Sequence, residues 1–241
     1  MSDKNLQDTP KAFPNAFDKK TTGRRRMMQL VAVLVASAIV GAGLYLMLGN
    51  ESLSESPDEV SEEVVECGVE AVDMGLSVRW ASCNVGAETP AEVGGYYAWG
   101  DSQEHATFGW RDATSYNRKY PTTLTEDVDI ATITMGEGWR MPTEEEFLEL
   151  IEKCEWREAE RDGCCGFEIV APNDNTIFLP AAGCKHDTTL YHDGWEALYW
   201  SASAVADNDN KRAKALQANN HERSLQEHYR YYGAQVRAVR E

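Results

Sequence analysis

The sequence predicts a small α+β domain with short strands, one clear helix and long loops, preceded by a single transmembrane helix. Three observations predict this architecture: an apolar segment without charges at 27–48, six cysteines that all follow it, and a strongly marked helix start at Thr143. A chain of 241 residues has room for one such domain and its appendages. We place the domain at 68–241, because the hydrophobic fraction of 42% suits a globular core and the first 66 residues contain almost no aromatics.

The charge changes sign across the apolar segment. Residues 1–26 carry seven Lys or Arg and three Asp or Glu, a balance of +4, and residues 27–48 carry no charge. The whole chain has a formal charge of −17, which leaves −21 on residues 49–241. An acidic surface repels the phosphates of nucleic acids, so we expect no nucleic-acid partner.

The segment 27–48 has the length and polarity of a membrane-spanning helix. As a helix its 22 residues would extend about 33 Å, and the hydrocarbon core of a bilayer is about 30 Å thick. Arg24, Arg25 and Arg26 precede it, and acidic residues follow it from Glu51 onwards. The positive-inside rule therefore predicts a cytoplasmic N-terminus and a domain that lies in the periplasm or outside the cell. A cleaved signal peptide is the alternative, but its apolar stretch would be shorter.

The segments on either side of this helix have the composition of unfolded chain. Residues 1–26 show no hydrophobic periodicity, and we predict a disordered basic cytoplasmic tail. Residues 49–67 form a predicted acidic, flexible linker, because seven of the residues in 49–66 are Asp or Glu and repel one another. Its expected role is to hold the domain away from the membrane.

One helix can be placed with its boundaries. Thr143 is a good N-cap, Glu146 stands three residues later as in a capping box, and acidic residues occupy the first turn. The helix is predicted to run to about Lys153. Its apolar residues recur at helical spacing and predict one buried face; they are Phe147, Leu150, Ile151 and Cys154.

Several strands follow from apolar runs bounded by turn residues. Phe167–Val170 and Thr176–Pro180 predict a β-hairpin, because the residues between them favour a turn. Tyr199–Ser203 predicts a further strand. Gly233–Arg240 predicts a final strand that returns to pair near the start of the domain.

The cysteines lie at positions 67, 83, 154, 164, 165 and 184. An even number on the exported side of a membrane indicates disulfides, although six cysteines allow fifteen pairings. Their spacing, and that of the histidines, does not match a structural zinc site. The disulfide candidates are Cys83, Cys154, Cys164, Cys165 and Cys184.

Six stretches resemble, in their order along the chain, the motifs of the Fibrobacter succinogenes major paralogous domain family, which is abundant in Bacteroidota. They are Asp73–Ala87 (DMGLSVRWASCNVGA), Gly95–Gly100 (GYYAWG), Gly138–Thr143 (GWRMPT) with Glu146 and Phe147, Asn175–Gly183 (NTIFLPAAG), Tyr199–Ser201 (YWS) and Val236–Arg240 (VRAVR). The resemblance implies a C-type-lectin-like domain and a bridge between Cys83 and Cys154. It implies no particular activity, because the family has no established common function.

Four tryptophans lie inside these motifs, at positions 80, 99, 139 and 200. Stacking on sugar rings is one interpretation, and packing in the core is the one we favour, because a small sheet domain needs large apolar anchors. The histidines at 105, 186, 192, 221 and 228 are interpreted as exposed loop residues.

The segment 205–232 is the predicted contact surface, because it reads as a polar loop rich in residues that make adaptable contacts. The candidate ligand-binding residues are Asp207, Asn208, Asp209, Asn210, Asn219, Asn220, His221, Tyr229, Tyr231 and Tyr232. We expect no cofactor. Calcium is the one alternative, because Pro172–Asp174 and Asp207–Asn210 offer hard oxygen ligands, but both read more simply as turns.

No catalytic constellation is recognisable, and we therefore predict a non-enzymatic, membrane-anchored binding module whose ligand is an unidentified glycan or protein. Two alternatives stay open. One is an enzyme related to formylglycine-generating proteins, with Cys164 or Cys184 as the reactive thiol. The other is a structural envelope protein that self-assembles.

Overall fold

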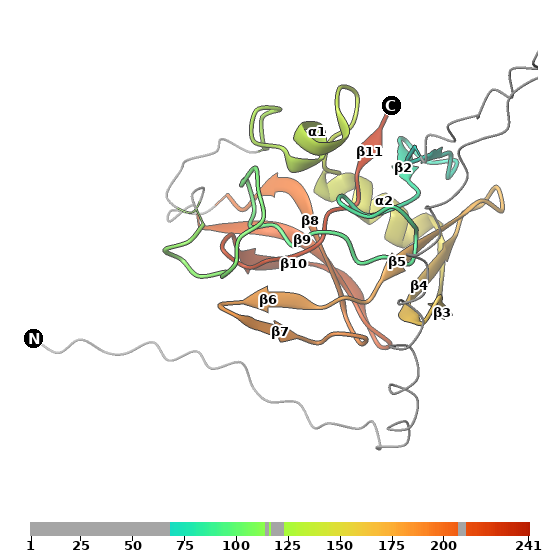
Figure 1. The fold of residues 1–241 in the computed structure, drawn as a ribbon. Helices are drawn as coiled ribbons and strands as arrows, with labels where there is room; N and C mark the ends of the chain where they lie inside the picture. Colours follow the sequence, from blue (N-terminus) through green and yellow to red (C-terminus); the bar gives the residue numbers. More distant parts are fainter. Residues whose placement is uncertain (1–67, 114–115, 117–122, 207–210) are drawn as a thin grey trace, which may run out of the picture. The chain divides into compact units, whose positions relative to one another are not determined.

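Short strands in several small sheets make up most of the domain, with one clear helix packed against them (Figure 1). The computed structural model describes residues 68–113, 116, 123–206 and 211–241. Within these ranges no helix is both long and apolar enough to cross a membrane. The predicted tail, transmembrane helix and linker at 1–67 and the candidate residues Asp207–Asn210 lie outside the described ranges.

In the part of the chain that the structure describes, the strands are grouped into three three-stranded sheets and one two-stranded hairpin, all antiparallel. The sheets are, in strand order, β1 (Ala71–Val72), β2 (Arg79–Ala81) and β11 (Val239–Arg240); β10 (Arg223–Tyr229), β9 (Arg212–Ala218) and β8 (Ala197–Ala204); and β3 (Glu155–Arg161), β4 (Cys164–Val170) and β5 (Thr176–Pro180). The hairpin consists of β6 (Cys184–His186) and β7 (Thr189–Tyr191), and the helices are α1 (Ile130–Met135) and α2 (Glu144–Lys153).

Strand β8 lies between two parts of the hydrophobic core. Successive side chains of a strand point to opposite faces. Ala197 and Tyr199 therefore pack with the aromatic residues of α2 and β3–β5, whereas Leu198 and Trp200 pack on the opposite face with α1 and the C-terminal segment. Burial on both faces explains why the first half of β8, Ala197–Trp200, is apolar throughout instead of alternating.

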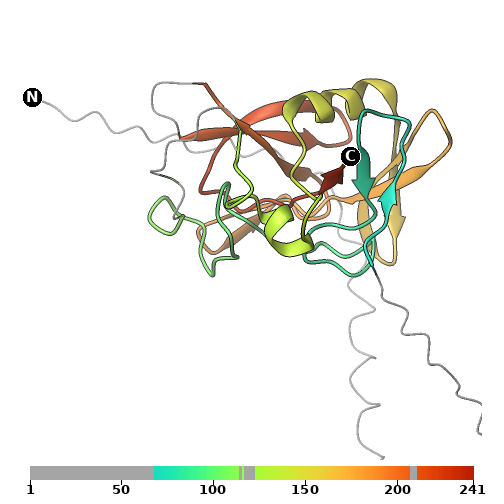
Figure 2. The ribbon, with the colours of Figure 1, turned by 90° about the horizontal axis from the view of Figure 1, so that it is seen from above.

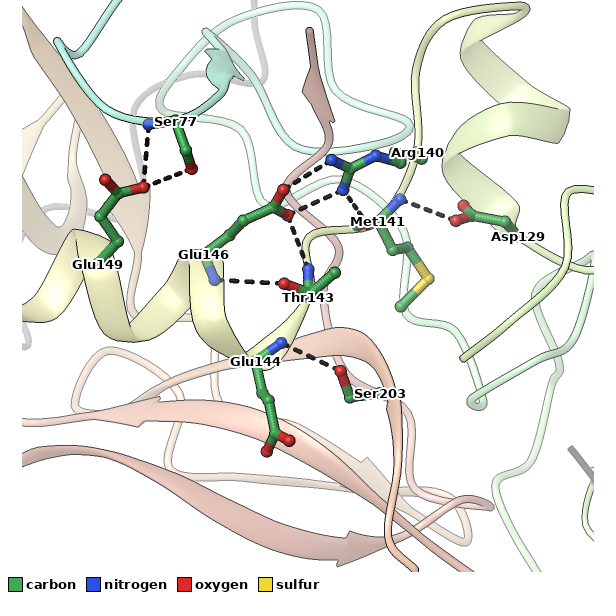
Figure 3. Close-up of polar contacts among 9 residues, drawn as sticks. All are labelled: Ser77, Asp129, Arg140, Met141, Thr143, Glu144, Glu146, Glu149 and Ser203. Atoms are coloured by element: carbon green, nitrogen blue, oxygen red, sulfur yellow. Dashed lines mark hydrogen bonds and ion pairs between the residues drawn. The ribbon is translucent and has the colours of Figure 1, made fainter. Parts of the chain in front are cut away.

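Helix α2 begins where the sequence predicts. The Thr143 hydroxyl accepts a hydrogen bond from the Glu146 backbone N–H (3.3 Å), and the Glu146 carboxylate accepts one from the Thr143 N–H (2.8 Å), which completes the capping box (Figure 3). The same carboxylate receives two hydrogen bonds from the guanidinium of Arg140, at 2.6 and 2.8 Å. Phe147 and Leu150 are fully buried, as the predicted face requires.

The C-terminal segment 233–240 passes through the middle of the domain and connects its sheets. Its backbone pairs with β6 at Lys185, with β8 at Tyr199 and with β2 at Trp80. The predicted return to the start of the domain is confirmed, but the regular ladder is limited to Val239–Arg240, because the rest pairs with several partners one residue at a time.

The Arg237 side chain is fully buried within this segment and contacts two distant parts of the chain, the segment 81–84 and strand β5. Its guanidinium donates to Asn84 Oδ1 (2.9 Å), to the Ala81 carbonyl (2.8 Å) and to the Phe178 carbonyl (2.7 Å). The Asn84 amide in turn donates to the Tyr199 hydroxyl at 3.1 Å. Because all of these acceptors are neutral, burial lowers the pKa of the Arg237 guanidinium, which nevertheless stays charged at ordinary pH.

The motif tryptophans are core residues, as predicted. Trp80, Trp99 and Trp200 are fully buried and Trp139 nearly so. The Trp99 indole donates to the Ser201 carbonyl (2.8 Å), and the Trp200 indole donates to the Tyr97 carbonyl (2.9 Å). These hydrogen bonds join the segment Gly95–Gly100 to the segment Tyr199–Ser201. Because Trp99 and Trp200 are buried in these contacts, they are not available to stack on a ligand.

The predicted hairpin of β4 and β5 is confirmed, with Ile169 opposite Ile177. The interpretation of 205–232 as a polar loop is wrong, because half of it forms strands β9 and β10. The sequence signal for strand β9 was weak because its buried positions are mostly alanines, whose small side chains give little hydrophobic alternation.

The capping box makes a prediction about stability. Replacing Thr143 with Ala removes the acceptor for the Glu146 N–H and should lower the free energy of unfolding by about 1 kcal/mol. Urea denaturation of the full-length chain, followed by circular dichroism, measures the change. Thr143→Ser keeps the hydroxyl and should retain most of the stability. Equal losses in the two variants would contradict the capping role.

Candidate ligand-binding surface

The β9–β10 hairpin separates the predicted ligand-binding residues into two groups. Tyr229 pairs with Arg212 at one end of the hairpin, whereas Arg223 pairs with Ala218 at the other. Seven-residue strands place these ends about 20 Å apart. The tyrosines at 229, 231 and 232 therefore lie far from the asparagines at 219 and 220 and from His221.

The group at the turn has a structural role. Asn219 Oδ1 accepts hydrogen bonds from the backbone N–H groups of His221 (2.9 Å) and Glu222 (3.0 Å). This is the way an Asn side chain closes a turn. The Asn219 side chain is therefore engaged in connecting β9 to β10, and we do not retain this group as part of the candidate surface.

The other group forms a cluster of rings in mutual contact, which we call the tyrosine cluster. Tyr229 stacks on Tyr231, with ring centres 5.4 Å apart and planes at 13°. Tyr231 also meets Tyr232 at 5.1 Å in an edge-on arrangement. The members come from three separate parts of the chain, and they are Tyr116, His186, His228, Tyr229, Tyr231 and Tyr232.

The imidazoles of this cluster are partly buried among the tyrosines. His186, at the tip of the β6–β7 hairpin, lies 4.9 Å from Tyr232 and 5.6 Å from Tyr231. His228, on β10, lies edge-on to Trp200 and near Tyr232. The prediction that both histidines are exposed loop residues is therefore wrong, since each packs against aromatic rings from another segment.

A second group of rings lies next to the tyrosine cluster, and we call it the hairpin patch: Tyr191, His192 and Trp195. The His192 ring is nearly perpendicular to both Tyr191 and Trp195, with ring centres 6.5 and 5.6 Å away. All three residues are exposed. His192 has a φ of 61°, an uncommon conformation for a residue with a side chain, in the tight turn that follows β7.

Polar side chains connect the two groups beneath the surface. His192 Nδ1 lies 3.0 Å from the buried carboxylate of Glu196, which accepts a hydrogen bond from the Gln217 amide at 2.7 Å. The Gln217 carbonyl oxygen lies 3.2 Å from His228 Nε2. The Gln217 side chain orients both imidazole rings. Its amide N–H donates to the Glu196 carboxylate, which holds His192, and its carbonyl oxygen accepts from His228.

The two histidines respond in opposite ways to this environment. The hydrogen bond to Glu196 raises the pKa of His192, because it stabilises the imidazolium. Burial lowers the pKa of His228, because the charged ring loses solvent, and the Glu196 charge opposes this only in part. Burial likewise raises the pKa of the Tyr231 and Tyr232 hydroxyls, which stay protonated and can donate hydrogen bonds.

Most of these residues escaped the sequence reasoning. Tyr116, His186, Tyr191, His192 and Trp195 come from segments far from β10, and no local pattern relates them. The sequence did contain a signal for the β6–β7 hairpin, which carries His186 and Tyr191. Asp187 stands between two short strand-like runs, and an Asp in that place favours a hairpin turn.

A groove of about 870 Å³ near the start of α2 is the main alternative location for a ligand-binding site. Its walls include Asp129, Trp139, Arg140 and Arg240. Asp129 caps α1 by accepting from the Ala131 and Thr132 N–H groups and also accepts from the Met141 N–H at 2.8 Å (Figure 3). Its carboxylate is buried, which raises its pKa, and its contacts join α1 to the segment before α2. These polar groups are thus occupied in structural contacts.

The described cysteines are free thiols: Cys83, Cys154, Cys164, Cys165 and Cys184. Cys83 is buried, with Sγ 3.7 Å from the Glu88 carbonyl oxygen, and Cys154 ends α2 against the core. The bridge that the resemblance implies between them stays a prediction. Burial raises the pKa of the Cys154, Cys164 and Cys184 thiols, in the last case to about 12, so none of these three is activated as a thiolate.

The described residues contain no group of three or more His, Cys, Asp or Glu side chains arranged to hold a metal ion. Of the two predicted calcium alternatives, Pro172–Asp174 lies in the turn between β4 and β5, where the Asn173 amide donates to the Asp73 carbonyl (2.8 Å). The other, Asp207–Asn210, lies outside the described ranges.

Comparisons of the chain with protein-family models, with curated proteins and with solved structures found no match.

The opposite pKa shifts predict how pH affects stability. His192, with a raised pKa, contributes stability that is complete below the unfolded-state pKa of about 6.5 and is lost as pH rises through the folded-state value. His228, with a lowered pKa, reduces stability as pH falls from about 6.5 to its folded-state value, because the unfolded chain takes up the proton first.

Urea unfolding of the full-length chain at a series of pH values, from about 5 to about 8, measures both effects. Relative to the wild type, His192→Asn should lose more free energy of unfolding at the acid end of this range than at the alkaline end. His228→Gln should show the reverse, with the smaller loss at the acid end. The same pH dependence in both variants would contradict the assignment.

Proposed function

We propose that residues 68–241 form a C-type-lectin-like binding module, exported and held at a membrane by residues 27–48. The lectin-like assignment rests on the ordered sequence motifs. The mostly-sheet architecture with one clear helix is compatible with it. The tether and the export rest on the apolar segment and on the change of charge across it.

The tyrosine cluster is the observation that carries the binding function. Its rings come from three separate segments and from outside the recognised motifs, whose tryptophans are used in the core. Tyr229 keeps 41% of its surface exposed even though it stacks on Tyr231. Rigid rings with a polar tip bind ligands at a low entropic cost, which explains their frequency in binding surfaces.

A binding screen with matched variants tests this proposal. The full-length chain is immobilised and exposed to a glycan array and to purified bacterial envelope proteins. A ligand of the tyrosine cluster should bind roughly tenfold more weakly to Tyr229→Ser. Leu148→Ser is the control, because Leu148 is also exposed (40%) but lies on α2. If every ligand that binds the wild type binds Tyr229→Ser equally well, the cluster is not the binding site.

A further inference from the structure

We propose that the ligand of this domain is an extended oligosaccharide, which lies across the hairpin patch and the tyrosine cluster together. This inference rests on the proposed binding function and names its ligand class. Three features of the surface support it: its continuity, its partly exposed rings, and the polar atoms at the ring edges.

The hairpin patch and the tyrosine cluster form one surface. In the β6–β7 ladder Cys184 lies opposite Tyr191, and His186 lies opposite Thr189. Residues two apart on a strand, and residues directly opposite across a ladder, share a face. Tyr191 is therefore on the face that carries His186, whose ring contacts Tyr232.

Partly exposed rings lie at both ends of this surface. Trp195 and Tyr191 are 37% and 39% exposed, and each meets His192 nearly perpendicularly, at 87° and 86°. At the other end Tyr229 stacks on Tyr231 by one face and is 41% exposed. The C–H face of a pyranose packs on the exposed part of an aromatic ring, and several separated rings would each hold a different unit of a chain.

Polar atoms at the ring edges match the hydroxyl groups that surround a sugar. His192 Nδ1 is held by Glu196, so Nε2 is the ring nitrogen that can meet a ligand. The tyrosine hydroxyls of the cluster both donate and accept hydrogen bonds. A sugar hydroxyl also does both, so the edges of the surface suit a ligand that is apolar on its faces and polar at its rim.

An interface with a protein would favour a different composition. The centre of such an interface is apolar, with aromatic rings next to aliphatic side chains and Arg. The exposed aliphatic residue of the hairpin is Leu190, which lies opposite Lys185 and therefore on the other face. The face with Tyr191 carries Cys184, His186 and Thr189 and no large aliphatic residue of the hairpin strands, and for this reason we favour a sugar over a protein.

Binding of defined sugars tests the inference. The full-length chain, in a detergent without a sugar headgroup, is titrated calorimetrically with linear oligomers of glucose, xylose and N-acetylglucosamine of increasing length. The oligomer that binds should do so more tightly as it lengthens and then reach a plateau, because successive units occupy successive rings. A chelator should not weaken binding, since ring faces and ring-edge atoms supply the contacts.

Matched variants locate the binding on the surface. Trp195→Ala and Tyr229→Ala should each weaken the binding of the longest oligomer roughly tenfold, while Trp195→Phe should keep most of the affinity. Leu190→Ala is the control, because Leu190 is as exposed as Trp195 but lies on the opposite face of the hairpin. Circular dichroism establishes that each variant is folded.

The possible failures are distinguishable. The inference is wrong if no oligomer binds, if affinity does not depend on length, or if Leu190→Ala weakens binding as much as Trp195→Ala. If an envelope protein binds through Tyr229 and no oligomer does, the ligand is a protein, and the proposed binding function stands without the sugar. If neither class of ligand binds, the proposed function fails as well.

Discussion

The guanidinium of Arg237 is fully buried and donates to three oxygens, which come from two parts of the chain that are far apart in sequence, 81–84 and Phe178. A buried charge is costly unless every donor has a partner, so these contacts fix the positions of the segments that supply the oxygens. Through Asn84 and Tyr199 the same network reaches β8. The contacts of this one side chain therefore join the C-terminal segment to the segment 81–84 and to β5, and through Asn84 to β8.

The residues of the recognised motifs serve the scaffold. Trp99 and Trp200 donate to carbonyls in each other's motifs, and Arg140 holds the Glu146 carboxylate that caps α2. The candidate binding surface comes from residues between and outside the motifs. The two groups are not wholly separate, because His228 of the tyrosine cluster lies edge-on to Trp200 in the core.

Local signals predicted the elements that local contacts stabilise. Helix α2 was placed with its cap because the Thr143–Glu146 box and the buried Phe147 are features of a single stretch. Strand β7 was missed because all of its residues are exposed, which leaves no alternating pattern to read. The candidate binding surface was predicted only in part, at Tyr229, Tyr231 and Tyr232, because the rings around them come from distant segments through tertiary packing.

A double-mutant cycle between Asn84 and Arg237 tests this account most directly. Unfolding free energies are measured for the wild type, Asn84→Ala, Arg237→Ala and the double variant. The account predicts that the two substitutions are strongly non-additive, with a coupling of at least about 1 kcal/mol, because each one disables the same buried network. Additive losses would mean that Arg237 does not hold the C-terminal segment through Asn84, and would contradict the account.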